Sequence, residues 1–246
     1  MERWKVRVAI ATGASAGIGY ELSKRLVQLG VPTQSLSQEL STSGGKLVAM
    51  KCDVRKEEDI LSVISAVKSQ FGGADICVNN AGLANNAPLL SGTTEKWREM
   101  MEVNVLGLCI MTREFIKQLR ERNVDDGHVF FINSTVGHHP IASFGASFYS
   151  GTKFAVTALT EGLRKELRDI KSNIKITAVS PGIVATEFAP RLMNMANPKE
   201  AVSTAYDQFG ITVLQPEDIA NCVLYALSTP PRMQIHDILV RLTQQA

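Results

Sequence analysis

The sequence has few cysteines, almost no excess of charge of either sign, and no long hydrophobic run. Its 26 basic and 24 acidic residues leave a formal charge of +2, too little to create a broad field that attracts nucleic acid or an anionic membrane. No segment approaches the roughly 18 apolar residues of a membrane span. The charged start of the chain is unlike a secretory signal peptide. We therefore expect a cytoplasmic protein with no nucleic-acid partner and no membrane span.

The cysteines are Cys52, Cys77, Cys109 and Cys222. They lie far apart, and none stands at metal-ligand spacing or in a C-x-x-C pair. Free thiols beside apolar segments usually behave as small buried side chains. The sequence therefore predicts no metal site and gives the cysteines no chemical role.

Strand-like and helix-like segments alternate along the chain, which predicts a parallel sheet covered by helices on both faces. The expected strands are residues 5–11, 47–50, 75–78, 129–132, 174–179 and 235–240. The expected helices are residues 18–29, 60–71, 95–122, 149–168 and 216–227. We find no internal repeat and no linker between these segments. The fold class is thus predicted as α/β, a doubly wound parallel sheet of the Rossmann type, with residues 1–246 as a single domain.

Residues 31–45 fit this pattern poorly, although they should carry the second strand. They have proline at their second position and few β-branched apolar residues. A buried parallel strand needs a continuous apolar run, and only Val31 and Leu36 could serve at the start of this stretch. We therefore expect the second strand to be short or missing.

A glycine-rich segment, Thr12 to Gly19, lies between the first expected strand and the first expected helix. In this position Gly13 would permit a tight turn, and Gly17 would let the backbone approach a phosphate. Gly19 would let the helix pack closely on the sheet. The helix N-terminus would offer unpaired N–H groups and a positive dipole end to a pyrophosphate. This context favours nucleotide binding over a purely steric turn.

Tyr149 and Lys153 stand four residues apart at the start of an expected helix, so that both side chains would lie on one face. A free tyrosine has a pKa of about 10 and is a poor acid or base at neutral pH. A neighbouring ammonium would lower this pKa and make Tyr149 a proton shuttle. Taken alone, the same spacing also suits an ordinary pair on a helix surface.

Ser134 supports the catalytic interpretation, because it follows the expected strand at 129–132, at the carboxyl end where an open α/β sheet binds its ligands. Its hydroxyl could hold the oxygen of a substrate. A hydrolase that uses this serine would need a base, and His138 or His139 could be proposed. No G-x-S-x-G elbow surrounds the serine, however. We expect these histidines to line or flank a substrate loop.

Taken together, these motifs resemble the short-chain dehydrogenase/reductase superfamily, in its branch of single-domain enzymes. The resemblance rests on TGxxxGxG from Thr12, NNAG from Asn79, the serine motif at Ser134, Y-x-x-x-K from Tyr149 and PG at Pro181. It implies an oxidoreductase that transfers a hydride between NADP(H), with NAD(H) as the alternative, and an alcohol or carbonyl compound. The implied catalytic residues are Asn104, Ser134, Tyr149 and Lys153.

The same resemblance implies a set of residues that bind the dinucleotide. Asp53 and Val54 would contact adenine, although Asp53 could also cap the helix that follows. Backbone groups of Ile183 and Val184 would meet the nicotinamide carboxamide, and Thr186 the phosphates. The full implied set is Gly13, Ser15, Gly17, Ile18, Gly19, Asp53, Val54, Asn80, Ala81, Gly82, Tyr149, Lys153, Pro181, Gly182, Ile183, Val184 and Thr186.

Asn104 matches the asparagine that holds a water near the active lysine in this family. The alternative is a polar residue that is satisfied between helices without a catalytic role. The family's dimer surface corresponds to residues 95–122 and 149–168, where Ala155, Ala158 and Gly162 are small enough for close packing. The resemblance therefore implies a homodimer or homotetramer.

Within the family, the sequence is most similar to the group of mammalian dehydrogenase/reductase family member 11 and insect farnesol dehydrogenases. Residues 1–4, 123–128, 161–167 and 235–244 carry this resemblance. It implies a small lipophilic substrate, either a terpenoid alcohol such as farnesol or a steroid or dicarbonyl ketone. The pocket should lie under residues 188–209, whose Met193 and Met195 suit an apolar ligand or ordinary helix packing.

The chain departs from that group in residues 31–45, where it is about a dozen residues short. Between Gly30 and Gln38 no acidic residue is available for a ribose 2′-OH and no basic residue for a 2′-phosphate. NADP is therefore implied by the resemblance alone. The alternative to an active enzyme is a catalytically impaired Rossmann isoform with a broken adenosine half-site.

Overall fold

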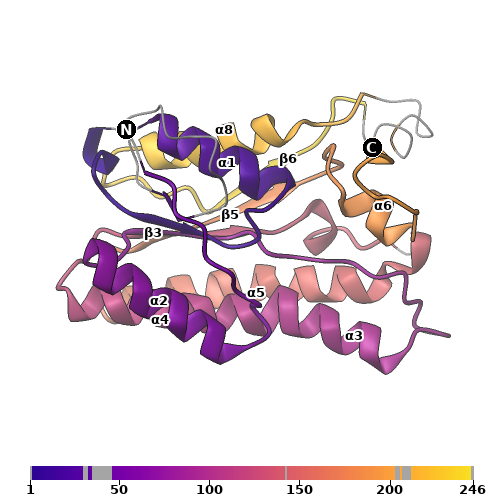
Figure 1. Ribbon diagram of the computed structural model, residues 1–246, viewed down its shortest axis with the longest axis horizontal. Helices are drawn as coiled ribbons and strands as arrows, with labels where there is room; N and C mark the ends of the chain where they lie inside the picture. The colour runs from indigo at the N-terminus through magenta and orange to yellow at the C-terminus, as the bar shows by residue number, and fades with distance from the viewer. Residues whose placement is uncertain are drawn as a thin grey trace.

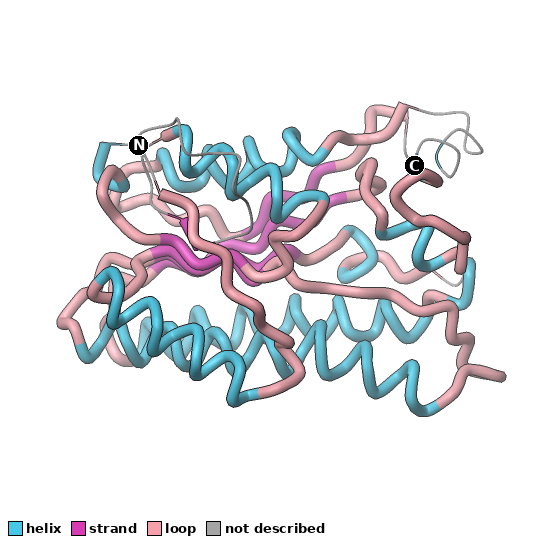
Figure 2. The backbone as a smooth tube through the Cα atoms, viewed as in Figure 1, coloured by secondary structure: helices cyan, strands magenta, loops and turns pink. Residues whose placement is uncertain are grey.

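The computed structural model describes residues 2–29, 33–34, 46–141, 143–202, 206 and 212–244. Six parallel strands form a sheet in the order β2-β1-β3-β4-β5-β6. They are β1 (Ala9–Ala11), β2 (Thr33–Gln34), β3 (Ile76–Asn79), β4 (His128–Ile132), β5 (Lys175–Pro181) and β6 (Asp237–Val240). Figure 2 shows the strands as a central layer between helices. The predicted α/β fold with a Rossmann-like parallel sheet is confirmed.

Helices cover both faces of this sheet (Figure 1). One face carries α1 (Gly17–Gln28) and α8 (Pro216–Ser228). The other carries α2 (Glu57–Phe71), α4 (Leu108–Glu121) and α5 (Ser147–Asp169). Shorter helices are η1 (Glu2–Trp4), α3 (Thr94–Met101), η4 (Thr135–Gly137), η5 (Ser143–Gly145) and α6 (Phe188–Leu192).

Successive side chains of each strand point to opposite faces of the sheet, so a separate hydrophobic core lies on each face. In β4, Phe130 packs with Leu22 and Leu26 of α1, whereas Val129 and Phe131 join the cluster under α2, α4 and α5. All of these side chains are buried. The continuous apolar run of β4 is thus explained by burial on both faces.

The second strand is short, as predicted from residues 31–45. Thr33 pairs with Ala9 and Gln34 with Ile10, and the strand contains only these two residues. The rest of that segment lies outside the described residues. The strand predicted at residues 47–50 is wrong, because the described stretch 46–56 contains only an isolated bridge residue at Leu47. A two-residue edge strand offers few backbone groups to pair with a further strand beyond it.

The predicted helix at residues 95–122 contains an irregularity that its apolar spacing does not reveal. Between α3 and α4 the chain forms a π-helical turn, η3 (Glu102–Gly107). Such turns are rare and are found frequently at functional sites. Gly107 makes the turn compatible with its surroundings, because a Cβ atom there would lie 2.6 Å from the Val54 carbonyl oxygen.

In the part of the chain that the structure describes, no helix is long and apolar enough to cross a membrane. Within the same residues no group of three or more His, Cys, Asp or Glu side chains is placed to hold a metal ion. All four cysteines are free. Burial raises the pKa of the Cys77 thiol to about 12, so this group is an inert part of the core.

Candidate active site

The carboxyl ends of β1, β3, β4 and β5 bring the sequence-predicted motifs to one edge of the sheet. Thr12 follows β1, Asn80 follows β3, Ser134 follows β4 and Gly182 follows β5. In an open parallel sheet this edge is where ligands bind. Residues that are far apart in the sequence therefore become neighbours.

Hydrogen bonds of Thr12 and Asn80 join the loop after β1 to the loop after β3. The Thr12 hydroxyl oxygen accepts hydrogen bonds from the backbone N–H groups of Asn80 (3.1 Å) and Ala81 (3.0 Å). The Asn80 amide donates to the carbonyls of Thr12 (2.9 Å) and Gly13 (3.0 Å). The shape of the glycine-rich loop thus depends on Thr12, a residue to which we had given no role from the sequence.

The glycines of this loop permit conformations and contacts that other residues would not. Gly13 has a φ of +63° and Gly17 a φ of +57°, both in the left-handed region. A Cβ atom at Gly19 would lie 2.4 Å from Asn80 Nδ2, and one at Gly17 would lie 3.0 Å from Thr186 Cγ2. Gly19 therefore makes room for Asn80, in addition to its predicted role in helix packing.

The beginning of α1 is suited to an anionic group. Its N-cap residue, Ala16, provides no capping side chain. Next to it is a cavity of about 360 Å³ whose lining includes Gly17, Thr186 and Lys199 together with three glutamates, Glu21, Glu187 and Glu217. Unpaired N–H groups at a helix start, next to glycines with positive φ, are the usual cradle for phosphate. These residues fit the pyrophosphate of a dinucleotide.

Ser134 and Tyr149 lie close together at this edge, and the Ser134 hydroxyl acts on the pKa of the Tyr149 phenol. Tyr149 is buried, and its ring centre lies 5.3 Å from that of Phe188. The Ser134 oxygen also accepts from the Val136 N–H at 3.3 Å and faces the Pro181 carbonyl at 3.5 Å. Burial raises the pKa of Tyr149, and the Ser134 hydroxyl opposes this shift.

Lys153 lies beside Tyr149 but interacts mainly with the backbone. Its Nζ atom donates to the Ile132 carbonyl at 2.9 Å and lies 5.9 Å from the centre of the Tyr149 ring. Burial lowers the pKa of Lys153 to about 8. We expected the ammonium to lower the pKa of Tyr149. The shift has the opposite direction in this structure, because burial raises the pKa of Tyr149 and Ser134 rather than Lys153 opposes this shift.

Asn104 lies in the π-helical turn and is almost completely buried. Its side-chain oxygen accepts from the Leu83 N–H at 2.9 Å, and its amide nitrogen donates to the Leu83 carbonyl at 2.8 Å. The same nitrogen donates to Thr152 Oγ1 at 3.0 Å. Asn104 thus joins η3, the loop after Gly82 and α5. It is satisfied by protein groups, as the alternative interpretation expected, and the predicted water remains a prediction.

Asp53 does not cap the helix that follows it, so this part of the prediction is wrong. Arg55 donates to the Asp53 carboxylate from its backbone and its guanidinium, and these hydrogen bonds lower the pKa of Asp53 to about 2. The N-cap of α2 is Lys56, which provides no side-chain cap. Asp59 instead accepts from the Asp53 N–H at 2.9 Å. The Asp53 carboxylate is committed to the arginine beside it.

The segment after β5 is fixed by backbone groups and by Tyr206. The Gly182 N–H donates to the Val240 carbonyl at 2.7 Å, and the Ile183 carbonyl accepts from Leu214 at 3.1 Å. The Tyr206 hydroxyl donates to the carbonyls of Val184 (2.7 Å) and Thr186 (3.1 Å).

Tyr206 is a site residue that sequence reasoning missed. It lies within the expected substrate segment, of which residues 203–205 and 207–209 are outside the described part of the chain. Ser15 is exposed at the glycine-rich loop, and Ile18 packs against the core under α1.

The histidines do not form a hydrolase site with Ser134. His138 contacts Ser180 and Asp237, and His139 is exposed. Among the described residues, the hydroxyl of Ser134 contacts Tyr149, Val136 and Pro181, none of which is a general base in such enzymes.

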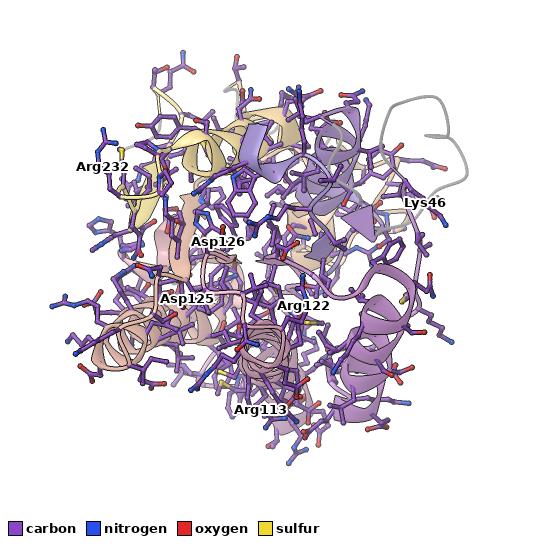
Figure 3. All side chains as sticks on the ribbon, turned by 90° about the vertical axis from the view of Figure 1, so that its left-hand side faces the viewer. Lys46, Arg113, Arg122, Asp125, Asp126 and Arg232 are labelled. Atoms are coloured by element: carbon purple, nitrogen blue, oxygen red, sulfur yellow. The ribbon has the colours of Figure 1, made fainter. Side chains whose placement is uncertain are left out.

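A second cavity, of about 770 Å³, lies at the opposite end of the sheet. Figure 3 looks toward this end, where Arg122, Asp125 and Asp126 are labelled. Arg7 pairs with Asp126 at 2.7 Å, and Arg122 pairs with Asp75 at 3.0 Å. These four charged lining residues are engaged in ion pairs, and the cavity lies at the amino ends of the strands, away from the predicted motifs.

The chain is similar to proteins of known class over its whole length. Residues 7–197 match the model of the family described as short chain dehydrogenase. Dehydrogenase/reductase SDR family member 11 of Bos taurus is 49% identical, with 100% of this chain and 99% of that protein covered. Farnesol dehydrogenase of Aedes aegypti is 37% identical, with 98% of each chain covered.

A solved structure, the closed form of serine dehydrogenase complexed with NADP+, matches with a TM-score of 0.85. It is 30% identical, with 97% of this chain and 96% of that chain covered. The alignment with the bovine protein spans 257 positions, at least 11 more than the 246 residues of this chain. That difference agrees in size with the dozen residues expected to be missing. The chain belongs to the short-chain dehydrogenase/reductase family.

Proposed function

We propose that this oxidoreductase transfers a hydride between NADP(H) and a lipophilic alcohol or ketone, acting as one dinucleotide-binding domain of residues 1–246. The observation that carries the proposal is the placement of Ser134 beside the buried Tyr149, with Lys153 Nζ 5.9 Å from the Tyr149 ring centre. These residues lie at the carboxyl edge of the sheet. The phosphate-compatible loop lies at the same edge, after β1, which is separated from β4 by β3.

The glycine-rich loop and the start of α1 would hold the pyrophosphate, with Thr186 beside Gly17. Asn80, Ala81 and Gly82 would border the adenine side, and the remaining predicted contacts are as inferred from the resemblance. The preference for NADP is supported by relatives, since serine dehydrogenase and an alcohol dehydrogenase from Thermococcus sibiricus are complexed with NADP+ and 5-hydroxy-NADP. When bound, the dinucleotide supplies the hydride donor or acceptor at its nicotinamide ring.

The residues of this chain would move the proton and hold the substrate. In the oxidation direction Tyr149 takes the proton of the substrate hydroxyl, and Ser134 steadies the substrate oxygen. Lys153 would hold the nicotinamide ribose, with its Nζ atom kept in place by the Ile132 carbonyl. Asn104 connects the loop at Leu83 to helix α5 through its hydrogen bonds to Leu83 and Thr152, beside the site.

The surroundings of Tyr149 favour an apolar substrate. Tyr149 belongs to a cluster of buried side chains with Leu192, and Phe188, Phe148 and Trp97 pack against it. Such a wall can bury a hydrocarbon chain but offers few polar groups to a sugar or an amino acid. The similarity to farnesol dehydrogenase makes farnesol the first compound to test.

Self-association through α4 and α5 is part of the proposal. Phe154 is 41% exposed and Leu159 is 37% exposed on α5, and a Cβ atom at Gly162 would meet nothing within 4 Å. These apolar side chains and the small residue would be covered in a homodimer or homotetramer. Light scattering of the purified protein measures its subunit number.

The decisive experiment is a titration of the purified protein with NADPH and, separately, with NADH. Nicotinamide fluorescence and thermal stability are followed together, and turnover of farnesol and of a ketone panel is then measured. We expect tighter binding of NADPH and turnover that is lost in Tyr149→Phe. A cooperatively folded protein that binds neither dinucleotide would overturn the proposal and favour the impaired isoform instead.

A further inference from the structure

His138 is held in a polar cluster directly after the turn that carries Ser134. Its Nε2 atom lies 3.0 Å from Ser180 Oγ and 3.0 Å from Asp237 Oδ2. Ser180 donates a hydrogen bond to Asp237 Oδ1 at 2.8 Å. These three residues, here called the His138 cluster, join η4, β5 and β6.

The contacts of the cluster fix where its hydrogens lie. The Ser180 hydroxyl uses its hydrogen toward Asp237, so its oxygen can only accept from His138, and a carboxylate also only accepts. The Nε2 atom of His138 therefore carries a hydrogen and donates to both partners. In a Ser–His–Asp hydrolase the two ring nitrogens face different partners. Here one nitrogen faces both and Ser180 is fully buried, so the cluster is not a nucleophilic site.

Besides the backbone hydrogen bond from the Asn133 N–H to the Val179 carbonyl (2.8 Å), side chains fasten the turn from Asn133 to His138 at two places. Toward α5, Asn133 donates to Thr157 Oγ1 at 2.9 Å, and Thr157 donates to the Gly137 carbonyl at 3.0 Å. Toward the sheet, His138 binds Ser180, whose neighbour Pro181 faces the Ser134 hydroxyl at 3.5 Å. The position of Ser134 is therefore determined between these two attachments.

The two attachments are not equivalent, because β5 is held independently of His138. Its backbone pairs with β4 on one side and with β6 on the other, including Ser180 with Leu239 and Pro181 with Val240. Loss of the His138 side chain would thus leave the strand and the turn after it in place. It would remove the side-chain attachment of η4 to the sheet, and with it this support of Ser134, while Thr157 still holds the Gly137 carbonyl.

We propose that His138 is a positioning residue for Ser134, which it holds within hydrogen-bond reach of Tyr149 by fastening the serine turn to Ser180 and Asp237. The inference rests on the proposed function, in which Ser134 steadies the oxygen of the substrate. A displacement of about 1 Å in an active site can reduce the rate by as much as a hundredfold. Dinucleotide binding uses other loops and should not change.

The test compares His138→Ala, His138→Gln and His139→Ala. Glutamine carries an N–H group the same number of bonds from Cβ as histidine Nε2, so it can preserve the donor. His139 is the exposed neighbour and provides the matched control. We expect His138→Ala to lower kcat for farnesol oxidation roughly tenfold to a hundredfold, with the Kd for NADPH unchanged. His138→Gln should recover most of the lost rate, and His139→Ala should behave as wild type.

Crystal structures of the same proteins give a readout that does not require turnover. In His138→Ala the Ser134 hydroxyl should move away from Tyr149, and in His138→Gln it should stay. An unmoved serine, an unchanged kcat, or a glutamine variant no better than alanine would each overturn the inference. Absence of turnover in the wild type would instead count against the proposed function. If the alanine variant does not fold, Ser180→Ala, which removes one acceptor of Nε2, is used in its place with the same expectations.

Discussion

The Nζ atom of Lys153 lies 5.9 Å from the centre of the Tyr149 ring and is hydrogen-bonded to the Ile132 carbonyl at 2.9 Å. Both side chains are buried, and burial disfavours the phenolate as well as the ammonium. The positions of the two side chains are therefore fixed by burial and by the Ile132 carbonyl rather than by attraction between a phenolate and an ammonium. The geometry of the pair and its protonation can thus be tested in separate experiments.

Replacement of Tyr149 by phenylalanine keeps the buried ring and removes the hydroxyl that meets Ser134. We expect turnover to fall by about 10²- to 10⁴-fold, the usual contribution of a positioned proton donor or acceptor. The Kd for NADPH, measured by fluorescence, should change far less than turnover, because the other predicted dinucleotide contacts remain. Tyr225→Phe on α8 is the matched control, because that tyrosine is 55% exposed. Equal turnover in the two variants would contradict a catalytic role for Tyr149.

The lowered pKa of Lys153 predicts a pH-dependent contribution to stability. Its pKa falls from 10.5 when exposed to about 8 in the folded protein, so the unfolded chain binds more protons between these values. The free energy of unfolding should therefore rise with pH in this window. Relative to Lys153→Met, the wild type should gain about 2 kcal/mol between pH 8 and pH 10.

Urea denaturation at several pH values measures this difference. Groups that titrate in both proteins cancel in the comparison. Lys165→Met removes an exposed lysine from the same helix and should follow the wild type across the range. A constant difference between wild type and Lys153→Met would show that the buried ammonium does not carry the effect.

The order of elements could be predicted from the sequence because local signals determine it. The apolar run of β4 and the glycines at Gly13 and Gly17 each depend on a short segment, and the structure agrees with them. The short second strand was also predictable, since residues 31–45 lack the apolar run that a buried strand needs. These features follow from periodicity and turn chemistry alone.

Features that depend on tertiary contacts could not be predicted. The π-helical turn Glu102–Gly107 has the same apolar spacing as an α-helix, and the close approach of Gly107 to Val54 is visible only in the folded chain. Asp53 had a suitable position for a helix cap, but Arg55 competes successfully for its carboxylate. Contacts between β5 and η4, such as Ser180 with His138, join segments that carry no sequence signal for each other.

Asn104→Ala should destabilise the protein and impair catalysis together. The change removes the side-chain partner of both backbone groups of Leu83, whereas the Thr152 hydroxyl keeps its hydrogen bond to the Tyr149 carbonyl. A buried polar group without a partner costs about 1 to 3 kcal/mol, so we expect a loss of roughly 2 kcal/mol or more in the free energy of unfolding. Leu106→Ala changes a 52% exposed residue of the same turn and should have little effect. Urea denaturation compares the two, and equal stability would contradict the bridging role.

Gly19→Ala tests whether the glycine-rich loop depends on close contact with Asn80. The new Cβ atom would lie 2.4 Å from Asn80 Nδ2 and 2.7 Å from the Gly13 carbonyl oxygen. Asn80 would have to release its hydrogen bonds to Thr12 and Gly13, which shape the loop. We expect a loss of about 1 to 3 kcal/mol in the free energy of unfolding, as for other overpacked sites. The Kd for NADPH should also rise markedly.

Gly151→Ala distinguishes this steric effect from the general cost of replacing a helical glycine. A Cβ atom at Gly151 would meet nothing within 4 Å, so alanine there should raise the free energy of unfolding by about 0.5 to 1 kcal/mol through its higher helix propensity. The two substitutions are chemically identical, and both positions lie in the first turn or second turn of a helix. Opposite signs of the stability change would therefore locate the effect in the contact with Asn80. A Gly19→Ala protein as stable as Gly151→Ala, with unchanged NADPH affinity, would mean that the loop adapts and that Asn80 does not hold its shape.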